Sequence, residues 1–398
     1  MRAASLSGAR RLYVATVASR SSRNSCWRGT LNNRGVTAAA ERRRMSSSTV
    51  AAAATASSTS TSSSSSSAAP FSLYRHPRLY DAAFAFRDFE AEARFLVDAW
   101  EKYGEGESKN LTSFLDVGAG TGRHGAALAK ISTSPASSLS LFALDASAEM
   151  LSAASKAAEE AGCPLKQAIR ADMTDGKPFG IDGEVQVALC ALGTLAHAVP
   201  PTLSNSSDAD ADSSDPALDA LRAVSSALVP GGILILELPA AGDLFDGTLL
   251  VGDAWDVPPG EWQREDEGDD GLEKKKPENE KRRIGQISKP KKKSTSPALI
   301  IEYGSPDDDF DPVSQVLMRT VVVSEARDDG SAGAEIGREV VPQRLFTPAE
   351  VRCLAREAGF GVAAELGDME LQGGEEGEEV PSAREGDRYV AVLVKKKK

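Results

Sequence analysis

The stretch Phe114-Leu115-Asp116-Val117-Gly118-Ala119-Gly120-Thr121-Gly122 joins an apolar run to three glycines at alternate positions. The apolar run predicts a buried strand over residues 113–117, and the apolar spacing after the glycines predicts a helix over 123–131. The dinucleotide fingerprint G-x-G-x-x-G would require a third glycine at position 123, where this chain has Arg123. The spacing therefore disfavours an NAD-dependent dehydrogenase.

Short apolar runs and helical stretches alternate around this turn, a pattern that predicts a parallel sheet with crossover helices. The predicted strands are residues 113–117, 140–144, 166–170, 185–190 and 233–238, and the predicted helices are 123–131, 148–161 and 216–228. One amphipathic helix is expected over 78–103, before the first strand. A helix over 348–358 precedes two closely connected strands, 361–366 and 388–394, which implies a final antiparallel pair.

About a hundred residues separate the fifth predicted strand from the last helix, and a connection of this length is either functional or partly disordered. Residues 298–303 and 313–324 read as strands, so we expect a small antiparallel sheet in an insertion over 240–346. Its segment 264–296 is charged and lysine-rich, and we interpret it as a disordered loop. The main domain then comprises residues 71–239 and 347–398.

The N-terminus differs in charge from the rest of the chain. Residues 1–50 contain ten Arg, no Lys and one acid, so they carry +9 of a total of −12 and the remainder carries −21. This composition is typical of an organelle transit peptide, which we place at 1–45, followed by a disordered Ser/Ala linker at 46–70. The expected location is the mitochondrion or plastid. A disordered basic tail is an alternative, and the location would be cytoplasmic if translation starts at Met45.

Composition also disfavours several classes of protein. The acidic body makes nucleic acid a poor partner, and no apolar stretch approaches the roughly 18 to 20 residues of a membrane span. The four Cys and three His are scattered, so neither a disulfide framework nor a metal site is predicted. The oligomeric state stays open.

Acidic residues follow successive predicted strands. Asp116, Asp145 and Asp172 end the first three strands, and Cys190 ends the fourth. Ligands of open α/β sheets bind beyond the carboxyl ends of the strands, so we expect these side chains to converge. A carboxylate such as Asp145 can accept hydrogen bonds from two ribose hydroxyls. The alternatives are a helix N-cap for Asp145 and simple stabilisation of a turn for Asp116.

This series of motifs resembles the class I S-adenosylmethionine-dependent methyltransferases, of the small-molecule type with an insertion after the fifth strand. The resemblance covers roughly residues 80–394 apart from the charged segment, and it includes the D-x-G-x-G-x-G pattern of 116–122 and the segment Leu228-Val229-Pro230-Gly231-Gly232. It implies a Rossmann-like, seven-stranded, mostly parallel sheet with a final antiparallel strand, plus a small antiparallel β lid formed by the insertion. It also implies S-adenosyl-L-methionine as cofactor and a small-molecule acceptor.

The resemblance assigns a cofactor site. The glycines let the backbone approach the methionine part of the cofactor, Met150 flanks the adenine, and Asp172 accepts a hydrogen bond from the adenine amino group. The N-terminal helix with Tyr80, Asp81 and Phe84 is expected to close over the cofactor. The full set of expected cofactor-binding residues is Tyr80, Asp116, Gly118, Ala119, Gly120, Gly122, Asp145, Ala146, Met150, Asp172, Met173 and Cys190.

The acceptor side is less defined by the sequence. Methyl transfer from a sulfonium requires mainly alignment of donor and acceptor, and a general base is needed only for a protonated acceptor. His197 is the candidate base, although a lone His beside an apolar segment is also a common structural residue. An acceptor pocket would draw on the insertion, with Trp255, Trp262, Tyr303, Arg319 and Arg344 as candidates. Two functional alternatives are a non-catalytic organelle assembly or interaction factor with the same fold, and a protein methyltransferase.

Overall fold

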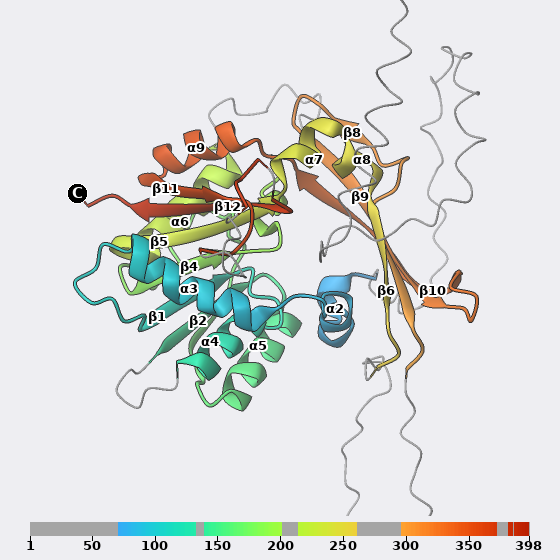
Figure 1. The fold of residues 1–398 in the computed structure, drawn as a ribbon, viewed down its shortest axis with the longest axis horizontal. Helices are drawn as coiled ribbons and strands as arrows, with labels where there is room; N and C mark the ends of the chain where they lie inside the picture. The colour runs from blue at the N-terminus through green and yellow to red at the C-terminus, as the bar shows by residue number, and fades with distance from the viewer. Residues whose placement is uncertain are drawn as a thin grey trace, which may run out of the picture.

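The computed structural model describes residues 71–132, 139–200, 214–260, 296–371, 381–384 and 386–397. These residues form a seven-stranded α/β sheet and a separate five-stranded antiparallel sheet (Figure 1). The predicted transit peptide, the Ser/Ala linker and residues 264–295 of the charged segment lie outside the described residues, so those interpretations stay predictions. No helix within the described ranges is long and apolar enough to span a bilayer.

The seven-stranded sheet has the order β11-β12-β5-β4-β1-β2-β3. Strands β1 to β5 run parallel, and β12 pairs antiparallel with both β5 and β11. This confirms the predicted fold class, including the antiparallel strand. The strands are β1 (Ser113–Val117), β2 (Ser140–Asp145), β3 (Leu165–Arg170), β4 (Val185–Cys190), β5 (Leu228–Pro239), β11 (Phe360–Leu366) and β12 (Arg388–Lys395).

Helices cover both faces of this sheet. One face packs against α3 (Phe89–Tyr103), α4 (Arg123–Ile131) and α5 (Ala148–Glu160), and the other against α6 (Pro216–Ala227) and α9 (Pro348–Glu357). Neighbouring residues of β1 therefore enter different cores: Phe114 lies with the α3 side and Leu115 with the α6 side, each fully buried. Burial on both faces explains why the central strands are almost continuously apolar in sequence.

The prediction of one helix over 78–103 is wrong. The chain instead forms a short 3-10 helix η1 (Leu73–Arg75), the helix α2 (Pro77–Ala83), and then α3 from Phe89. The break has a local cause, because Asp88 accepts a hydrogen bond from the Ala91 N–H and two acids follow in the first turn of α3. Such a cap and acids favour a new helix start at this position.

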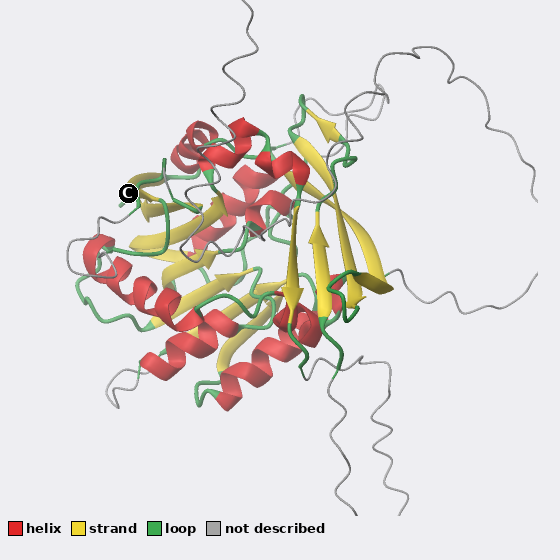
Figure 2. Cartoon of the chain, turned by 45° about the vertical axis from the view of Figure 1, so that its right-hand side comes forward, coloured by secondary structure: helices red, strands yellow, loops and turns green. Residues whose placement is uncertain are grey.

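The insertion forms the antiparallel sheet, with strand order β10-β9-β7-β6 and β8 paired to β9. Figure 2 shows this sheet standing to one side of the α/β sheet. The sequence predicted β7 and most of β9 but missed β6 and β10. The bounds are α7 (Ala241–Asp246), α8 (Thr248–Val251), β6 (Asp253–Val257), β7 (Leu299–Tyr303), β8 (Phe310–Asp311), β9 (Val316–Ala326) and β10 (Ala332–Arg344).

Candidate active site

The glycine turn after β1 lies against two neighbouring elements. Gly118, Gly120 and Gly122 have φ angles of +67°, +53° and +74°. A Cβ atom at Gly122 would lie 2.8 Å from the Cα of Ala154 in α5, and one at Gly118 would overlap the side chain of Thr194 beyond β4. Only glycine satisfies both the backbone angle and the close approach at these two positions. The turn thus holds the N-terminus of α4 at the tips of β1, β2 and β4.

Asp116 lies at the base of this turn with one oxygen unpartnered. Its carboxylate is 4% exposed, and Oδ2 has no hydrogen-bond partner. Burial raises the pKa of Asp116 to about 6; the charge of Asp145 adds to this and His124, with Nδ1 at 3.9 Å from Oδ2, opposes it. A buried acceptor without a partner is rare and indicates a site for a missing donor. Asp116 lines a narrow cavity together with Tyr80 and Gly118.

Asp145 is not the N-cap of α5, which was the alternative considered for it. Ser147 caps this helix by accepting from the Met150 N–H. The Oδ2 of Asp145 accepts from the Gly120 N–H and its Oδ1 from the Ser147 N–H, both at 2.8 Å. Each carboxylate oxygen can accept two hydrogen bonds, so both keep capacity for a ribose hydroxyl. The two backbone contacts therefore orient the Asp145 carboxylate and leave it able to accept further hydrogen bonds.

The other predicted cofactor residues are more dispersed. Asp172 is exposed and accepts from the N–H and hydroxyl of Thr174, while Met173 is buried in the core below β3. Cys190 belongs to the same core, and burial raises the pKa of its thiol to about 12, which keeps it neutral. Met150 is buried and Ala146 is exposed. The structure thus brings Asp116, Asp145 and the glycines together, whereas the cofactor contacts of Asp172, Met173 and Cys190 stay predictions.

His197 ends the 3-10 helix η2 (Thr194–His197) beyond β4 and contacts Tyr74. Its Nε2 lies 3.4 Å from the Tyr74 hydroxyl, and the two rings meet edge to face. Burial lowers the pKa of His197, and the charge of Asp172 opposes this shift. A neutral imidazole can accept a proton, so His197 keeps the chemistry expected of a base. Tyr74 was missed in the sequence because it precedes the predicted helix.

The N-terminal segment lies directly on the glycine turn. A Cβ at Gly120 would lie 3.4 Å from the ring of Tyr80, and Asp81 Oδ1 accepts from the Thr121 hydroxyl at 2.6 Å. Tyr80 packs on Phe84, with 4.7 Å between ring centroids. The cavity left between α2 and Asp116 is only about 20 Å³, whereas ligand pockets span roughly 300 to 1,000 Å³. The polar groups fit the cofactor, and the space between them is smaller than a nucleoside.

A second cavity, of about 370 Å³, lies between the tips of β4 and β5, the helices α7 and α8, and the antiparallel sheet. Three predicted acceptor residues, Tyr303, Arg319 and Arg344, line it. Leu192 lines both this cavity and the narrow one at Asp116. Its φ is +54°, an uncommon angle for a side-chain-bearing residue. Leu192 therefore lies between the two cavities.

Of the two other acceptor candidates, Trp255 does not line that cavity, and Trp262 lies outside the described residues. Trp255 donates from its indole N–H to the carbonyl of Ala83 at 2.8 Å and packs among Phe84, Phe86 and Tyr303. It therefore anchors the antiparallel sheet to the N-terminal segment.

Residues 114–208 match the family model of the methyltransferase domain. This segment, which holds the glycine turn and the strands β1 to β4, is a methyltransferase domain. S-adenosylmethionine is the methyl donor of this family, which agrees with the glycine turn and the two acids described above. No curated protein matches the chain.

Many solved structures share the fold. A methyltransferase from Clostridium acetobutylicum ATCC 824 is 14% identical with a TM-score of 0.49, over 80% of this chain and 97% of that one. The sugar N-methyltransferase KedS8 from Streptoalloteichus sp ATCC 53650 is 18% identical with a TM-score of 0.47, over 86% and 100% of the two chains. The domain match over residues 114–208 is therefore the comparison that identifies the methyltransferase domain.

A buried ion network lies beneath the methyltransferase site, and sequence reasoning missed it. Glu237, at the end of β5, pairs with Arg87 at 2.7 Å and with Arg388 at 3.2 Å, and its Oε2 accepts from the Leu192 N–H. Arg87 also pairs with Glu92 at 2.9 Å. Burial works to raise the pKa of Glu92, but a hydrogen bond from His124 and the charge of Arg87 lower it to about 2. Both acids are thus held ionised in the core.

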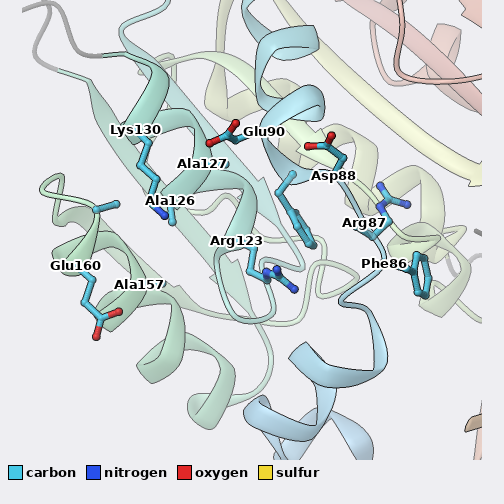
Figure 3. Close-up of a pocket in the computed structure, with 12 residues that line it drawn as sticks. Phe86, Arg87, Asp88, Glu90, Arg123, Ala126, Ala127, Lys130, Ala157 and Glu160 are labelled. Atoms are coloured by element: carbon cyan, nitrogen blue, oxygen red, sulfur yellow. The ribbon is translucent and has the colours of Figure 1, made fainter. Parts of the chain in front are cut away.

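A groove of about 550 Å³ lies against α3, α4 and α5, and Figure 3 draws the residues that line it. Arg123 and Lys130 extend into it from α4 and Glu160 from α5. None of its lining residues lies at a strand tip. Within the described ranges, no group of three or more His, Cys, Asp or Glu side chains is placed to hold a metal ion. The strand tips therefore remain the candidate site.

Proposed function

We propose that this chain transfers the methyl group of S-adenosylmethionine to a small-molecule acceptor bound in the 370 Å³ cavity. The observation that carries the proposal is the buried, unpartnered Oδ2 of Asp116 beside the glycine turn. An ammonium group is the strongest donor that such an oxygen could meet. Asp116 would accept from the amino group of the cofactor, and Asp145 from the ribose hydroxyls.

The bound cofactor supplies an activated methyl group together with its leaving group. The protein then has to hold the acceptor in line with that bond. The cavity at Leu192 supports this role because it adjoins the cofactor cleft and is lined by several apolar residues. His197 is the candidate base for an acceptor that arrives protonated, although its side chain contacts Tyr74 and does not line this cavity.

Calorimetry of the full chain with S-adenosylmethionine tests the proposal. We expect binding, and Asp145→Ala should weaken it at least about tenfold because two charge-assisted hydrogen bonds are lost. Asp98→Ala, an exposed acid on α3, is the matched control and should bind like the parent. Equal binding by a folded Asp145→Ala protein would reject the assigned site, and the absence of binding by the parent would reject the function.

The alternative of a non-catalytic factor is supported by the close packing of Tyr80 on Gly120, which leaves little space for a nucleoside. Incubation with labelled cofactor and fractionated cell extract separates the two functions. A labelled small molecule supports the enzyme, a labelled protein supports a protein methyltransferase, and tight cofactor binding without any labelled product supports the non-catalytic factor.

We also propose that residues 1–45 direct the chain to an organelle, because their charge is that of a transit peptide. A fluorescent protein fused after residue 70 should enter mitochondria or plastids. Replacing the ten N-terminal arginines with glutamine should leave the fusion in the cytosol. Cytosolic fluorescence of the unaltered fusion would favour the start at Met45.

A further inference from the structure

The inner face of the antiparallel sheet is apolar at one end and polar at the other. Apolar side chains at the first end pack against η1 and α2 and include Leu299, Ile301, Val321 and Val323. At the second end, Tyr303, Arg319 and Gln343 line the acceptor cavity. These three come from neighbouring strands, and Gln343 donates to the Tyr303 hydroxyl. Where this face borders the cavity, polar residues thus take the place of the apolar ones.

Arg319 is a buried cation that lacks an ion-pair partner. Its side chain bonds only neutral acceptors: Nε donates to Gln343 at 2.9 Å, Nη1 to the Tyr303 carbonyl at 3.1 Å, and Nη2 to the Leu249 carbonyl at 2.7 Å. Among the described residues, no carboxylate lies within ion-pair distance of it, and it is 4% exposed. Three of its five N–H groups are used, so one on each Nη remains.

Such a group is costly unless an anion binds it. Burial lowers the pKa of Arg319, although arginine stays protonated in proteins. A buried charge without a counter-ion destabilises the fold. Asp253 and Asp308 act on it only from a distance. A neutral side chain could hold the same carbonyl groups, so the positive charge itself indicates a ligand.

Two other charged groups of the cavity lining, Arg344 and Glu237, have ion-pair partners. Arg344 pairs with Asp215 at 2.8 Å and Glu350 at 2.7 Å, and Glu237 pairs with Arg87. The three remaining acids of the lining also have contacts of their own: Asp243, Asp253 and Asp387. Of the two arginines in the lining, Arg319 is therefore the one that has no ion pair with a described side chain.

We propose that the acceptor is a mainly apolar small molecule with one carboxylate, and that Arg319 binds this carboxylate through its two remaining N–H groups. The apolar part would pack on the leucine side chains and Phe346 that line the cavity. The methylated atom would lie toward Leu192, which lies between the cavity and the cofactor cleft. This inference rests on the proposed function, since it names the substrate class of the same site.

Three probes of similar size and different charge test the proposal: phenylacetate, phenylacetamide and phenethylammonium. Calorimetry is done on the full chain, with and without S-adenosylhomocysteine. Phenylacetate should bind at least about tenfold more tightly than the amide, the effect of a hydrogen bond between two charged groups. Equal or tighter binding of the amide or the ammonium, or no binding of phenylacetate, would overturn the proposal.

Two variants test whether Arg319 causes the preference for phenylacetate over phenylacetamide. Arg319→Gln should reduce phenylacetate binding to the level of the amide, and Arg338→Gln, an exposed arginine on β10 of the same sheet, should leave the preference unchanged. If Arg319→Gln does not fold, the probe comparison in the parent protein decides alone. Cofactor binding is titrated in the same samples. If the parent protein does not bind the cofactor, the proposed function is rejected. If the parent binds the cofactor but does not prefer phenylacetate over phenylacetamide, only this inference is rejected.

Discussion

The buried carboxylate of Asp116 lowers the stability of the unliganded fold, and we expect the same group to bind the cofactor. The pH dependence of stability measures this cost. The pKa of Asp116 is raised from 3.8 to about 6 by burial. The folded state therefore holds the proton more tightly than the unfolded chain, and stability is lost as the pH rises through about 4 to 6. Asp116→Asn removes the buried charge, so it should stabilise the unliganded protein by up to about 3 kcal/mol at pH 8 and have little effect at pH 4.

Urea denaturation at the two pH values measures this difference. The same variant should bind S-adenosylmethionine at least about tenfold more weakly, because the unpartnered oxygen is lost. In the parent protein, cofactor affinity should decline as the pH falls below about 6, as Asp116 becomes protonated. Destabilisation by Asp116→Asn at pH 8 would contradict the account.

Alanine substitutions at Gly122 and Gly162 distinguish the energetic cost of backbone strain from that of steric overlap. Both have positive φ angles, +74° and +77°, but a Cβ at Gly122 meets Ala154 at 2.8 Å whereas one at Gly162 meets nothing within 4 Å. Gly162→Ala should cost about 1 to 2 kcal/mol from the backbone angle alone. Gly122→Ala should cost about 3 kcal/mol or more and abolish cofactor binding. If both substitutions lower the stability equally in thermal denaturation, the glycine turn is not in close contact with α5.

The residues that local sequence could identify are those that act through local geometry. The glycines and Asp145 form a short turn whose spacing is legible in one stretch of sequence. Tyr74, Leu192 and Glu237 could not be found this way, because each gains its role from a partner more than forty positions distant. Nothing in the composition around Leu192 signals its positive φ.

At the level of secondary structure elements, the network of Glu237, Arg87 and Arg388 joins β5 to β12 and to the turn before α3. Glu237→Gln leaves buried arginines without their counter-charge and should destabilise the fold by about 3 to 5 kcal/mol in chemical denaturation. The exposed pair Arg94 and Glu90 is the control, and Glu90→Gln should cost less than about 1 kcal/mol. If Glu237→Gln and Glu90→Gln destabilise the fold by similar amounts, the network of Glu237 is accessible to solvent.

Strands and helices of the main sheet were predictable because each carries its own periodicity and turn signals. Two kinds of element were not. The segment 78–103 keeps one helical spacing across the break at Asp88, so apolar pattern alone could not separate α2 from α3. In β10, apolar and polar residues do not alternate regularly, and three residues are glycine or proline. Pairing with β9 along most of its length stabilises this strand.

Across the whole molecule, the charged segment of the insertion should be dispensable. Gly260 and Ser296 are bridged antiparallel at the open end of the pair β6 and β7. Replacing residues 261–295 with Asn-Gly should therefore close a hairpin. We expect the melting temperature to change by no more than about 2 °C and cofactor affinity to match that of the full chain. Loss of either would show that the segment contributes to the fold or the site.

The position of β12 also determines when this molecule can fold as it is synthesised. Residues 388–395 form the strand between β5 and β11, and Arg388 forms ion pairs with Glu92 and Glu237. A nascent chain therefore leaves the ribosome with two open strand edges until that last strand emerges, a state in which chains aggregate. Ribosome-associated chaperones are thus expected to protect translation of this chain, and a premature stop codon just before residue 388 would yield insoluble protein.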